Sequence, residues 1–435
     1  MYTPHQHRHS QRSLRKLHVE VLEDRCLLST YTLTDLGSLG GPYSVANAIN
    51  DAGQVAGGSL PTGGSHSHPF LWDSINGMQD LGVLHEVPNI VVTSAGLGIN
   101  SQGVVVGEAA VDSLRFHAFL YQDGILTDLA ALAGLDPRAN SAAYGINDAG
   151  EAVGFAFFGN GEEHAFFWDG TNPAQDLGTF GGSISFAYGV NSSGQVVGTA
   201  EFPGDEGRDA FLWDNENGLQ DLQIPGVATA INDAGQIVGG SGRAFLYSAG
   251  NVTDLGSPAG FSESIALAIN NLGQIVGYAR GSDQLHHHAF VYADGAMTDL
   301  NDLIPTGTGL TINEATGIND AGQIVGFAAD QGFHFHAVLL TPDDGSALRG
   351  ERAVGRLLAS GMAAPNVVAT APSPQALPAP LRPAAETMTL LPGEAKLCEA
   401  TDTVFASSHR THIPGPGDGF EIKEMELGLA LVPPS

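Results

Sequence analysis

Histidine is the residue type in this sequence whose placement could support chemistry. Three clusters occur: His66 with His68, His286 to His288, and His334 with His336. Neutral imidazole is a common ligand for zinc, copper and nickel, and acidic surroundings would help to hold a divalent cation. The candidate metal ligands are therefore His66, His286, His287 and His334, although their spacing matches no known zinc motif. A divalent cation is the only cofactor that the sequence suggests, and a structural role for these histidines is the alternative.

These histidines belong to a repeat that runs along most of the chain. One copy reads "GINDAGQIVGF", and seven copies can be aligned on one asparagine. The seven asparagines are Asn50, Asn100, Asn147, Asn191, Asn232, Asn270 and Asn319. They are 38 to 50 residues apart, which is too long for short solenoid repeats and is typical of propeller blades.

Each repeat contains four short β-type runs. Residues 142 to 180 give the clearest example, with "AAYGIN", "EAVGFAFF", "HAFFWD" and "AQDLGTF" in succession. Short β-rich runs separated by turn residues indicate an all-β fold, and the fixed period favours a propeller over a sandwich. We therefore predict a seven-bladed β-propeller built from four-stranded blades.

The sequence Asn-x-x-Gly between the first and second runs predicts a tight hairpin turn. A type I turn followed by glycine at positive φ requires this pattern of residues. A calcium-binding loop is the alternative, but it needs oxygen ligands at alternating positions over about twelve residues and a final Glu. Valine and glycine occupy those positions here, so the turn is the better interpretation.

The first run of each repeat is predicted to be the innermost strand. Only Gly or Ala occurs two and four residues before each asparagine, for example Gly145 and Ala143. Alternation along a strand would place both small residues on one face. We expect that face to lie where the blades converge on the axis, with the Ile or Val before each asparagine on the opposite face.

A histidine recurs at the start of the third run, in the triplet His-Ala-Phe. It is present as His68, His117, His164, His288 and His336, and the other two repeats have Asp209 and Arg243. Substitution by Asp or Arg suits a hydrogen-bonding role better than a shared metal site. We expect this histidine to bond a neighbouring strand or loop.

The count of the fourth runs predicts how the ring closes. The chain begins with a fourth run, "YTLTDLG" (residues 31–37), and its last repeat ends after a third run, "HAVLLTP". The N-terminal strand should therefore complete the last blade and hide its open edge. The predicted domains are an N-terminal export-like segment (1–30), the propeller (31–341) and a Pro/Ala-rich, mostly disordered tail (342–435).

Charge and composition limit the partners. Residues 31–341 contain 33 acidic residues, five arginines and no lysine. Such a surface repels phosphate, so nucleic acid is excluded as a partner and a lysine-dependent phosphate-binding loop is impossible. No apolar run is long enough to span a membrane. Only Cys26 and Cys398 occur, both outside the repeats, so no disulfide framework supports the fold.

Two resemblances bear on localisation. The pattern "GIND-GQ-VG … HAF-LW … DLG-LGG" over residues 31–341 resembles the HAF-type family of probable extracellular bacterial repeats, although Asp209, Arg243, Pro69 and Val338 depart from the triplet. The stretch "LEDRCLLS" (22–29) resembles the LEPR-xLL type of N-terminal segment found on exported proteins, with Asp24 in place of its proline. These resemblances imply an extracellular or cell-surface protein, and the repeat family has no established catalytic residues.

Two functional hypotheses follow. The first is a non-enzymatic, monomeric scaffold that binds a protein, glycan or cation through the variable loops between runs two and three and between runs four and one. The alternative is a secreted propeller enzyme, a polysaccharide lyase or hydrolase with catalytic residues in its loops. Neither catalytic nor cofactor-binding residues can be assigned, since Glu314 is the only acidic residue identified in an innermost run. An enzyme predicts an asymmetric polar cluster with raised carboxyl pKa values at one channel mouth, whereas a scaffold predicts sevenfold regularity.

Overall fold

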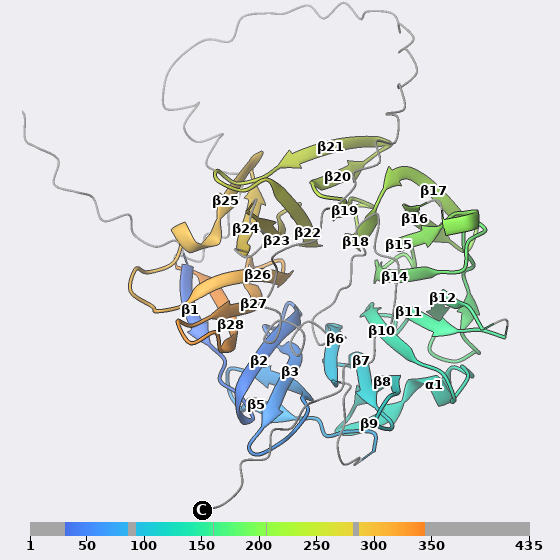
Figure 1. Ribbon diagram of the computed structural model, residues 1–435, viewed down its shortest axis with the longest axis horizontal. Coiled ribbons are helices and arrows are strands. Elements are labelled where there is room, and N and C mark those ends of the chain that lie inside the picture. Colours follow the sequence, from blue (N-terminus) through green and yellow to red (C-terminus); the bar gives the residue numbers. More distant parts are fainter. Residues whose placement is uncertain (1–30, 86–92, 160, 206, 282–286, 344–435) are drawn as a thin grey trace, which may run out of the picture.

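The protein is a ring of seven four-stranded antiparallel sheets around a central axis (Figure 1). The computed structural model describes residues 31–85, 93–159, 161–205, 207–281 and 287–343. It confirms the predicted seven-bladed β-propeller. The export-like segment, residues 1–30, and nearly all of the predicted tail lie outside the described residues.

In blades 1 to 6 the strands follow the sequence order from the innermost to the outermost. Blade 1 comprises β2 (Gly40–Ile49), β3 (Val55–Pro61), β4 (His68–Asp73) and β5 (Gly77–Asp80). Blade 2 comprises β6 (Ala95–Ile99), β7 (Val105–Ala110), β8 (Phe116–Gln122) and β9 (Ile125–Asp128). Blade 3 comprises β10 (Ser141–Ile146), β11 (Ala152–Phe157), β12 (Glu163–Trp168) and β13 (Gln175–Asp176). Blade 4 comprises β14 (Ser185–Val190), β15 (Val196–Glu201), β16 (Arg208–Asp214) and β17 (Gly218–Pro225).

The remaining blades repeat this order. Blade 5 comprises β18 (Val227–Ile231), β19 (Ile237–Gly240), β20 (Ala244–Ser248) and β21 (Asn251–Gly256). Blade 6 comprises β22 (Glu263–Ile269), β23 (Ile275–Arg280), β24 (His287–Ala293) and β25 (Ala296–Asp299). Blade 7 comprises β26 (Thr311–Ile318), β27 (Ile324–Ala329), β28 (Phe335–Pro342) and the N-terminal strand β1 (Tyr31–Asp35).

The N-terminal strand closes the ring as predicted. β1 pairs antiparallel with β28, with Tyr31 opposite Pro342 and Asp35 opposite Val338. Tyr31 is buried, and its backbone N–H donates to the carbonyl of Leu303 at 3.1 Å. The two ends of the repeat region therefore share one sheet, which leaves no blade with an unpaired third strand.

The tight turns between the first and second strands also agree with the sequence. In blade 1 the N–H of Gly53 donates to the carbonyl of Asn50 at 3.0 Å, and the N–H of Asn50 donates to the carbonyl of Gln54 at 3.0 Å. Gly53 has φ of 75°, a conformation that favours glycine. The corresponding glycines of the other six blades also have positive φ.

The innermost strands differ from the predicted regular alternation. Every one contains a β-bulge between the two small residues. In β10, Ala143 pairs with Gly154 and Gly145 pairs with Val153, so Tyr144 is an extra residue. Because Gly154 and Val153 are adjacent in β11, Ala143 and Gly145 face opposite sides of the blade. The prediction that the two small residues share one face was therefore wrong.

The bulge explains why both positions must be small. Ala143 packs against Val106 and Ala118 of the preceding blade. A Cβ atom on Gly145 would lie 3.0 Å from the carbonyl oxygen of Tyr188 in the following blade. Each innermost strand is thus in close contact with both neighbours, and neither side has room for a larger side chain.

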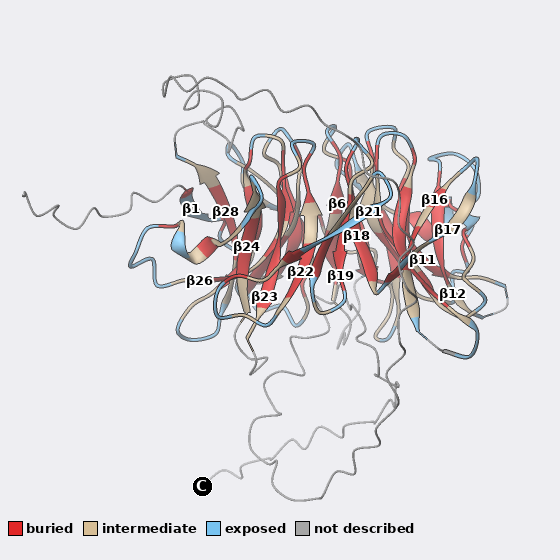
Figure 2. Cartoon of the chain, turned by 90° about the horizontal axis from the view of Figure 1, so that it is seen from above, coloured by how far each residue is buried: buried red, intermediate tan, exposed pale blue. Residues whose placement is uncertain are grey.

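Apolar side chains from adjacent sheets form the core between the blades. The phenylalanines of the His-Ala-Phe positions are fully buried in five blades: Phe70, Phe119, Phe166, Phe211 and Phe290. Figure 2 shows the buried strands in the middle of the disc and the exposed loops at its two faces. One short helix that the sequence did not predict, α1 (Leu129–Leu132), follows β9 and begins at Asp128, whose carboxylate accepts from the N–H of Ala131 at 3.2 Å.

Candidate functional site

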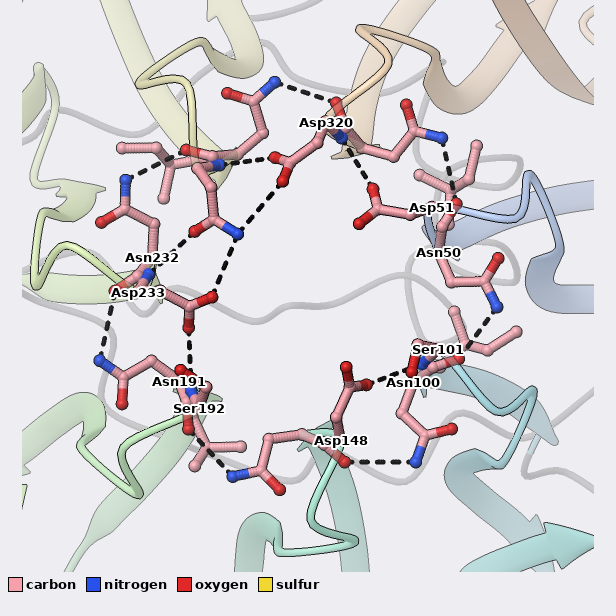
Figure 3. Close-up of a pocket in the computed structure, with 18 of the residues that line it drawn as sticks. Asn50, Asp51, Asn100, Ser101, Asp148, Asn191, Ser192, Asn232, Asp233 and Asp320 are labelled. Atoms are coloured by element: carbon pink, nitrogen blue, oxygen red, sulfur yellow. Dashed lines mark hydrogen bonds between the residues drawn. The ribbon is translucent and has the colours of Figure 1, made fainter.

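A closed ring of asparagine side chains surrounds the axis at the face formed by the tight turns (Figure 3). The Nδ2 of each repeat asparagine donates to the backbone carbonyl of the asparagine in the next blade, at 2.9 to 3.2 Å in all seven blades. The last bond runs from Asn319 to Asn50, across the point where the ring closes. All seven asparagines are buried, and each has an exposed fraction of 6% or less.

The same asparagines also hold their own turns. The Oδ1 of Asn232 accepts from the N–H groups of Ala234 at 3.1 Å and Gln236 at 2.9 Å, and its Nδ2 also donates to the Gln236 side chain at 2.8 Å. Each asparagine therefore satisfies its amide with local and inter-blade partners. Sequence analysis found the turn but missed the ring, because the inter-blade bonds join residues about one repeat apart.

The residue after each asparagine lines a pocket of about 230 Å³ on the axis. These residues are Asp51, Ser101, Asp148, Ser192, Asp233, Asn271 and Asp320. Several of their side chains also bond the neighbouring blade. Asp148 accepts from the N–H of Ser101 at 2.8 Å, and Asp51 accepts from the N–H of Asp320 at 2.9 Å. The repeated sequence Ile-Asn-Asp was the feature of the sequence that could have indicated that these side chains meet at the axis.

A second polar pair recurs near the rim, between the third and fourth strands. The Nδ1 of His68 lies 2.9 Å from Asp80, and the pairs His117 with Asp128, His164 with Asp176 and His336 with Asp35 have the same distance. His288 lies 2.6 Å from Asp299, and this hydrogen bond raises the pKa of the imidazole. The predicted hydrogen-bonding role of the third-strand histidine is confirmed.

Two blades replace this His–Asp pair. In blade 5, Arg243 takes the place of the histidine and bonds Asp254 at 2.8 Å. In blade 4 the pair consists of two carboxyl groups, Asp209 and Asp221. The pKa of Asp209 is raised, first by burial and then by the charge of Asp221. Blade 4 therefore has an unfavourable acid pair where the other blades have a complementary one.

The structure places the candidate metal ligands in separate parts of the ring. His66 packs near His68 in blade 1, with ring centroids 5.2 Å apart. His287 lies between blades 6 and 7, and His334 in blade 7 bonds Asp330 at 3.0 Å. His286 is outside the described residues. Within the described ranges, no group of three or more His, Cys, Asp or Glu side chains is arranged to hold a metal ion.

The loop face, where the second strand leads to the third and the fourth to the next blade, is not sevenfold regular. One irregular cluster lies around Tyr144, the bulge residue of blade 3. Its ring packs against those of Tyr188 and Phe155, at centroid distances of 5.2 and 6.0 Å. Burial raises the pKa of Glu108 to about 7 and also raises that of Glu163. Both carboxyl groups act electrostatically on the Tyr144 hydroxyl, whose own pKa is raised mainly by burial.

A second irregular cluster occupies the boundary between blades 6 and 7. We call it the 6–7 seam and define it by Tyr278, Arg280, His287, Asn313 and Glu314. The guanidinium of Arg280 lies 4.9 Å from the Tyr278 ring centroid and donates to the Tyr278 hydroxyl at 3.2 Å. His287 stacks on the same tyrosine at 5.7 Å, and its Nδ1 lies 3.6 Å from Glu314.

The 6–7 seam departs from the pattern of the other blades at two inner-strand positions. The residue equivalent to Glu314 is Val45, Ala95, Ala142, Phe186, Val227 or Ile265. Counted from the repeat asparagine, the residue equivalent to Asn313 is serine in five blades and glycine in blade 5. In β26, however, Asn313 is an extra residue between Ile312 and Glu314 in the pairing with β27. Four of those serines accept from the third strand of the preceding blade, as Ser185 does from the N–H of Ala165 at 2.8 Å. Ser94 accepts from the N–H of Ala110 in its own blade at 3.0 Å. Asn313 instead donates to the carbonyl of His287 at 3.3 Å.

Comparison with known proteins gives no family and weak structural similarities. No protein-family model matches the sequence, and no curated protein matches it. A crystal structure of a puromycin hydrolase mutant matches with a TM-score of 0.48 and 13% identity, over 68% of this chain and 51% of that one. The lectin BP39L from Burkholderia pseudomallei matches with a TM-score of 0.40 and 12% identity, over 73% and 96% of the two chains. The six-bladed Aleuria aurantia lectin has a TM-score of 0.30 and 12% identity, over 72% and 96%.

Restoring the His–Asp pair in blade 4 should stabilise the protein. We expect Asp209→His to raise the free energy of unfolding by about 1 kcal/mol, because a hydrogen-bonded pair replaces two repelling carboxyl groups. Urea denaturation at pH 6.5 measures the change, with Asp209→Asn as the control that removes only the charge. A histidine variant no more stable than wild type would contradict the pairing role.

The raised pKa of Glu108 predicts a pH-dependent stability. Its ordinary pKa is 4.5, so the folded chain holds this proton more tightly than the unfolded chain. Stability is therefore lost as the pH rises from about 4.5 to about 7. Glu108→Gln should raise the free energy of unfolding by about 1 to 2 kcal/mol at pH 8 and leave it unchanged near pH 4. The exposed Glu216→Gln is the control, and an equal effect of Glu108→Gln at both pH values would refute the assignment.

Proposed function

We propose that this chain is an exported or cell-surface β-propeller that binds a protein, glycan or cation through its loop face and performs no catalysis. The proposal concerns a single ring acting as a monomer. Its support comes from the contrast between the two faces of the disc.

The loss of sevenfold regularity on one face carries the binding part of this proposal. It does not separate a scaffold from an enzyme, because raised carboxyl pKa values on that face are what we expected of an enzyme. On the tight-turn face, one hydrogen-bond pattern repeats in all seven blades, as expected of a surface under a structural constraint. Towards the loop face, the second-strand position that Glu108 occupies in blade 2 is Glu, Phe, Thr, Tyr or Gly, depending on the blade. Polar side chains gather at the 6–7 seam. Rigid strands that support variable loops are where binding surfaces commonly occur.

The extracellular setting rests on sequence features. The resemblance to HAF-type repeats covers the whole ring, and the N-terminal stretch resembles an export-associated segment. The excess of acidic residues over the ring disfavours nucleic acid and anionic lipid as ligands. In the part of the chain that the structure describes, no helix has the length and apolar character needed to cross a bilayer.

A secreted polysaccharide lyase or hydrolase is the second candidate, and the Glu108 cluster favours it. A carboxyl group whose pKa is about 7 is suited to general acid catalysis at neutral pH. Glu163 is a second carboxyl group with a raised pKa near the same tyrosine. However, the cluster has no hydrogen-bonded nucleophile and base among the described residues, so we rank binding first.

Thermal unfolding of the full chain tests the proposal. The protein is heated with chelator, with separate divalent metals, and with a panel of soluble polysaccharides. A ligand that binds only the folded state raises the melting temperature in a saturable way. We expect such a shift with one ligand class, and we expect residue changes at the loop face to reduce it.

Two outcomes would contradict the proposal. If every shift were lost on changing Asp51 or Asp148 and none on changing the loop face, the binding surface would be the axial pocket. If a polysaccharide were cleaved and Glu108→Gln or Glu163→Gln abolished cleavage, the enzyme would replace the scaffold. Release of new reducing ends, or of unsaturated ends detected by their ultraviolet absorbance, is measured in the same samples.

A further inference from the structure

We infer that the 6–7 seam is a binding site for a neutral saccharide. This inference rests on the proposed loop-face function and adds to it a location and a ligand class. The side chains that carry it are those of Tyr278, Arg280, His287, Asn313 and Glu314.

The seam combines an aromatic stack with hydrogen-bonding groups of both kinds. Tyr278 and His287 are nearly parallel, with an interplanar angle of 19°. Arg280 offers N–H donors, whereas Glu314 offers acceptor oxygens. Saccharides need this combination, because each hydroxyl can both donate and accept while the C–H face of a sugar ring packs on an aromatic surface. Tyr278 is buried against Arg280 and His287, so the partly exposed His287 ring would supply that surface.

Two buried polar atoms in the seam have no hydrogen-bond partner among the described residues. They are the Nε of Arg280, a donor, and the Oδ1 of Asn313, an acceptor. A buried polar group without a partner is rare and calls for an explanation. Seven other atoms of this kind occur elsewhere among the described residues, and all nine are closed to solvent. The two atoms therefore support the seam only together with its stacking and its charges.

The charges around Arg280 select a neutral ligand. Arg115, Arg138, Arg208 and Arg243 each form an ion pair with a carboxylate. For Arg280 the structure shows no such pair in its described part, but Glu263 is its partner in the β22–β23 register. Glu263 and Glu314 both act electrostatically on Tyr278.

An anionic sugar would therefore meet two carboxylates for one guanidinium, in a ring with 33 acidic residues and five arginines. A cation would be repelled by Arg280 itself and would find few unshared ligands. A neutral polyhydroxyl compound avoids both costs. The seam therefore favours a neutral saccharide over a uronate or a metal ion.

Substitution by the residues of other blades tests the seam without introducing foreign side chains. Glu314→Ala copies Ala95, His287→Ser copies Ser67, and Asn313→Ser copies the serine found in five blades. Asp51→Ser copies Ser101 on the opposite face and is the matched control. Each variant is made in the full chain, and its folding is checked by its melting temperature.

Isothermal titration calorimetry measures the binding of neutral and charged probes. The neutral probes are cellohexaose, xylohexaose, mannohexaose and maltohexaose. The charged probes are oligogalacturonate and oligomannuronate. We expect at least one neutral probe to bind wild type. Glu314→Ala and His287→Ser should weaken that binding at least tenfold, and Asp51→Ser should change it less than twofold.

The possible failures are distinguishable. Tighter binding of the uronates than of the neutral probes would overturn the seam inference. Binding of a neutral probe that the seam variants leave unchanged would also overturn it. In both cases other loop-face variants would still locate the binding surface, and the proposed function would stand. Absence of binding to every saccharide would also overturn the seam inference. The proposed binding function would then be tested by the thermal unfolding measurements with divalent metals. Loss of all binding in Asp51→Ser alone would overturn both the inference and the proposed function.

Discussion

Seven side-chain amides hold the blades of this propeller together at the axis. Each asparagine uses its Oδ1 to close its own turn and its Nδ2 to reach the backbone of the next blade. A side chain that fixes the local turn therefore also fixes the distance between blades. Because the amides are buried, a lost partner would leave a polar group without water, which is costly. The ring makes the geometry of each blade depend on that of its neighbours.

This constraint determines much of the remaining sequence. Blades tied together at the axis bring their innermost strands so close that glycine or alanine is required on both sides of the bulge. Further out the blades diverge, and phenylalanines fill the widening space. At the rim, the His–Asp pair joins the third strand to the fourth. At the loop face the His–Asp pair occurs in five blades and the other contacts vary, so residues there can differ between blades.

Much of the fold could be predicted from the sequence because its signals are local and repeated seven times. The Asn-x-x-Gly turn, the four β runs and the role of residues 31–37 in closing the ring were all predicted. The bulge at Tyr144 was not, because a one-residue insertion leaves the Gly and Ala spacing unchanged. The asparagine ring and the axial pocket also escaped prediction, since they depend on contacts between residues some 40 positions apart.

The candidate site was less accessible to sequence reasoning. His287 was predicted as a metal ligand, and Glu314 as the only acidic residue of an innermost run, which overlooked Glu263 at the start of β22. Nothing in the sequence indicated that His287 and Glu314 lie 3.6 Å apart. Their proximity results from the packing of one blade against the next. The histidines proposed as metal ligands belong to three different blades, and the described ones have separate partners: His66 lies near His68, His287 near Glu314 and His334 near Asp330.

Asn232→Asp tests the central claim most directly, because aspartate keeps the Oδ1 acceptor of the turn and replaces the Nδ2 donor to Asn270 and to the Gln236 side chain by a charged oxygen. Asn251→Asp is the control, since Asn251 is exposed and also donates to a backbone carbonyl, that of Ala249. Urea denaturation at pH 7 should show Asn232→Asp losing about 2 to 3 kcal/mol of unfolding free energy, and the control less than about 1 kcal/mol. Equal small losses in the two variants would show that the asparagine ring does not hold the blades together.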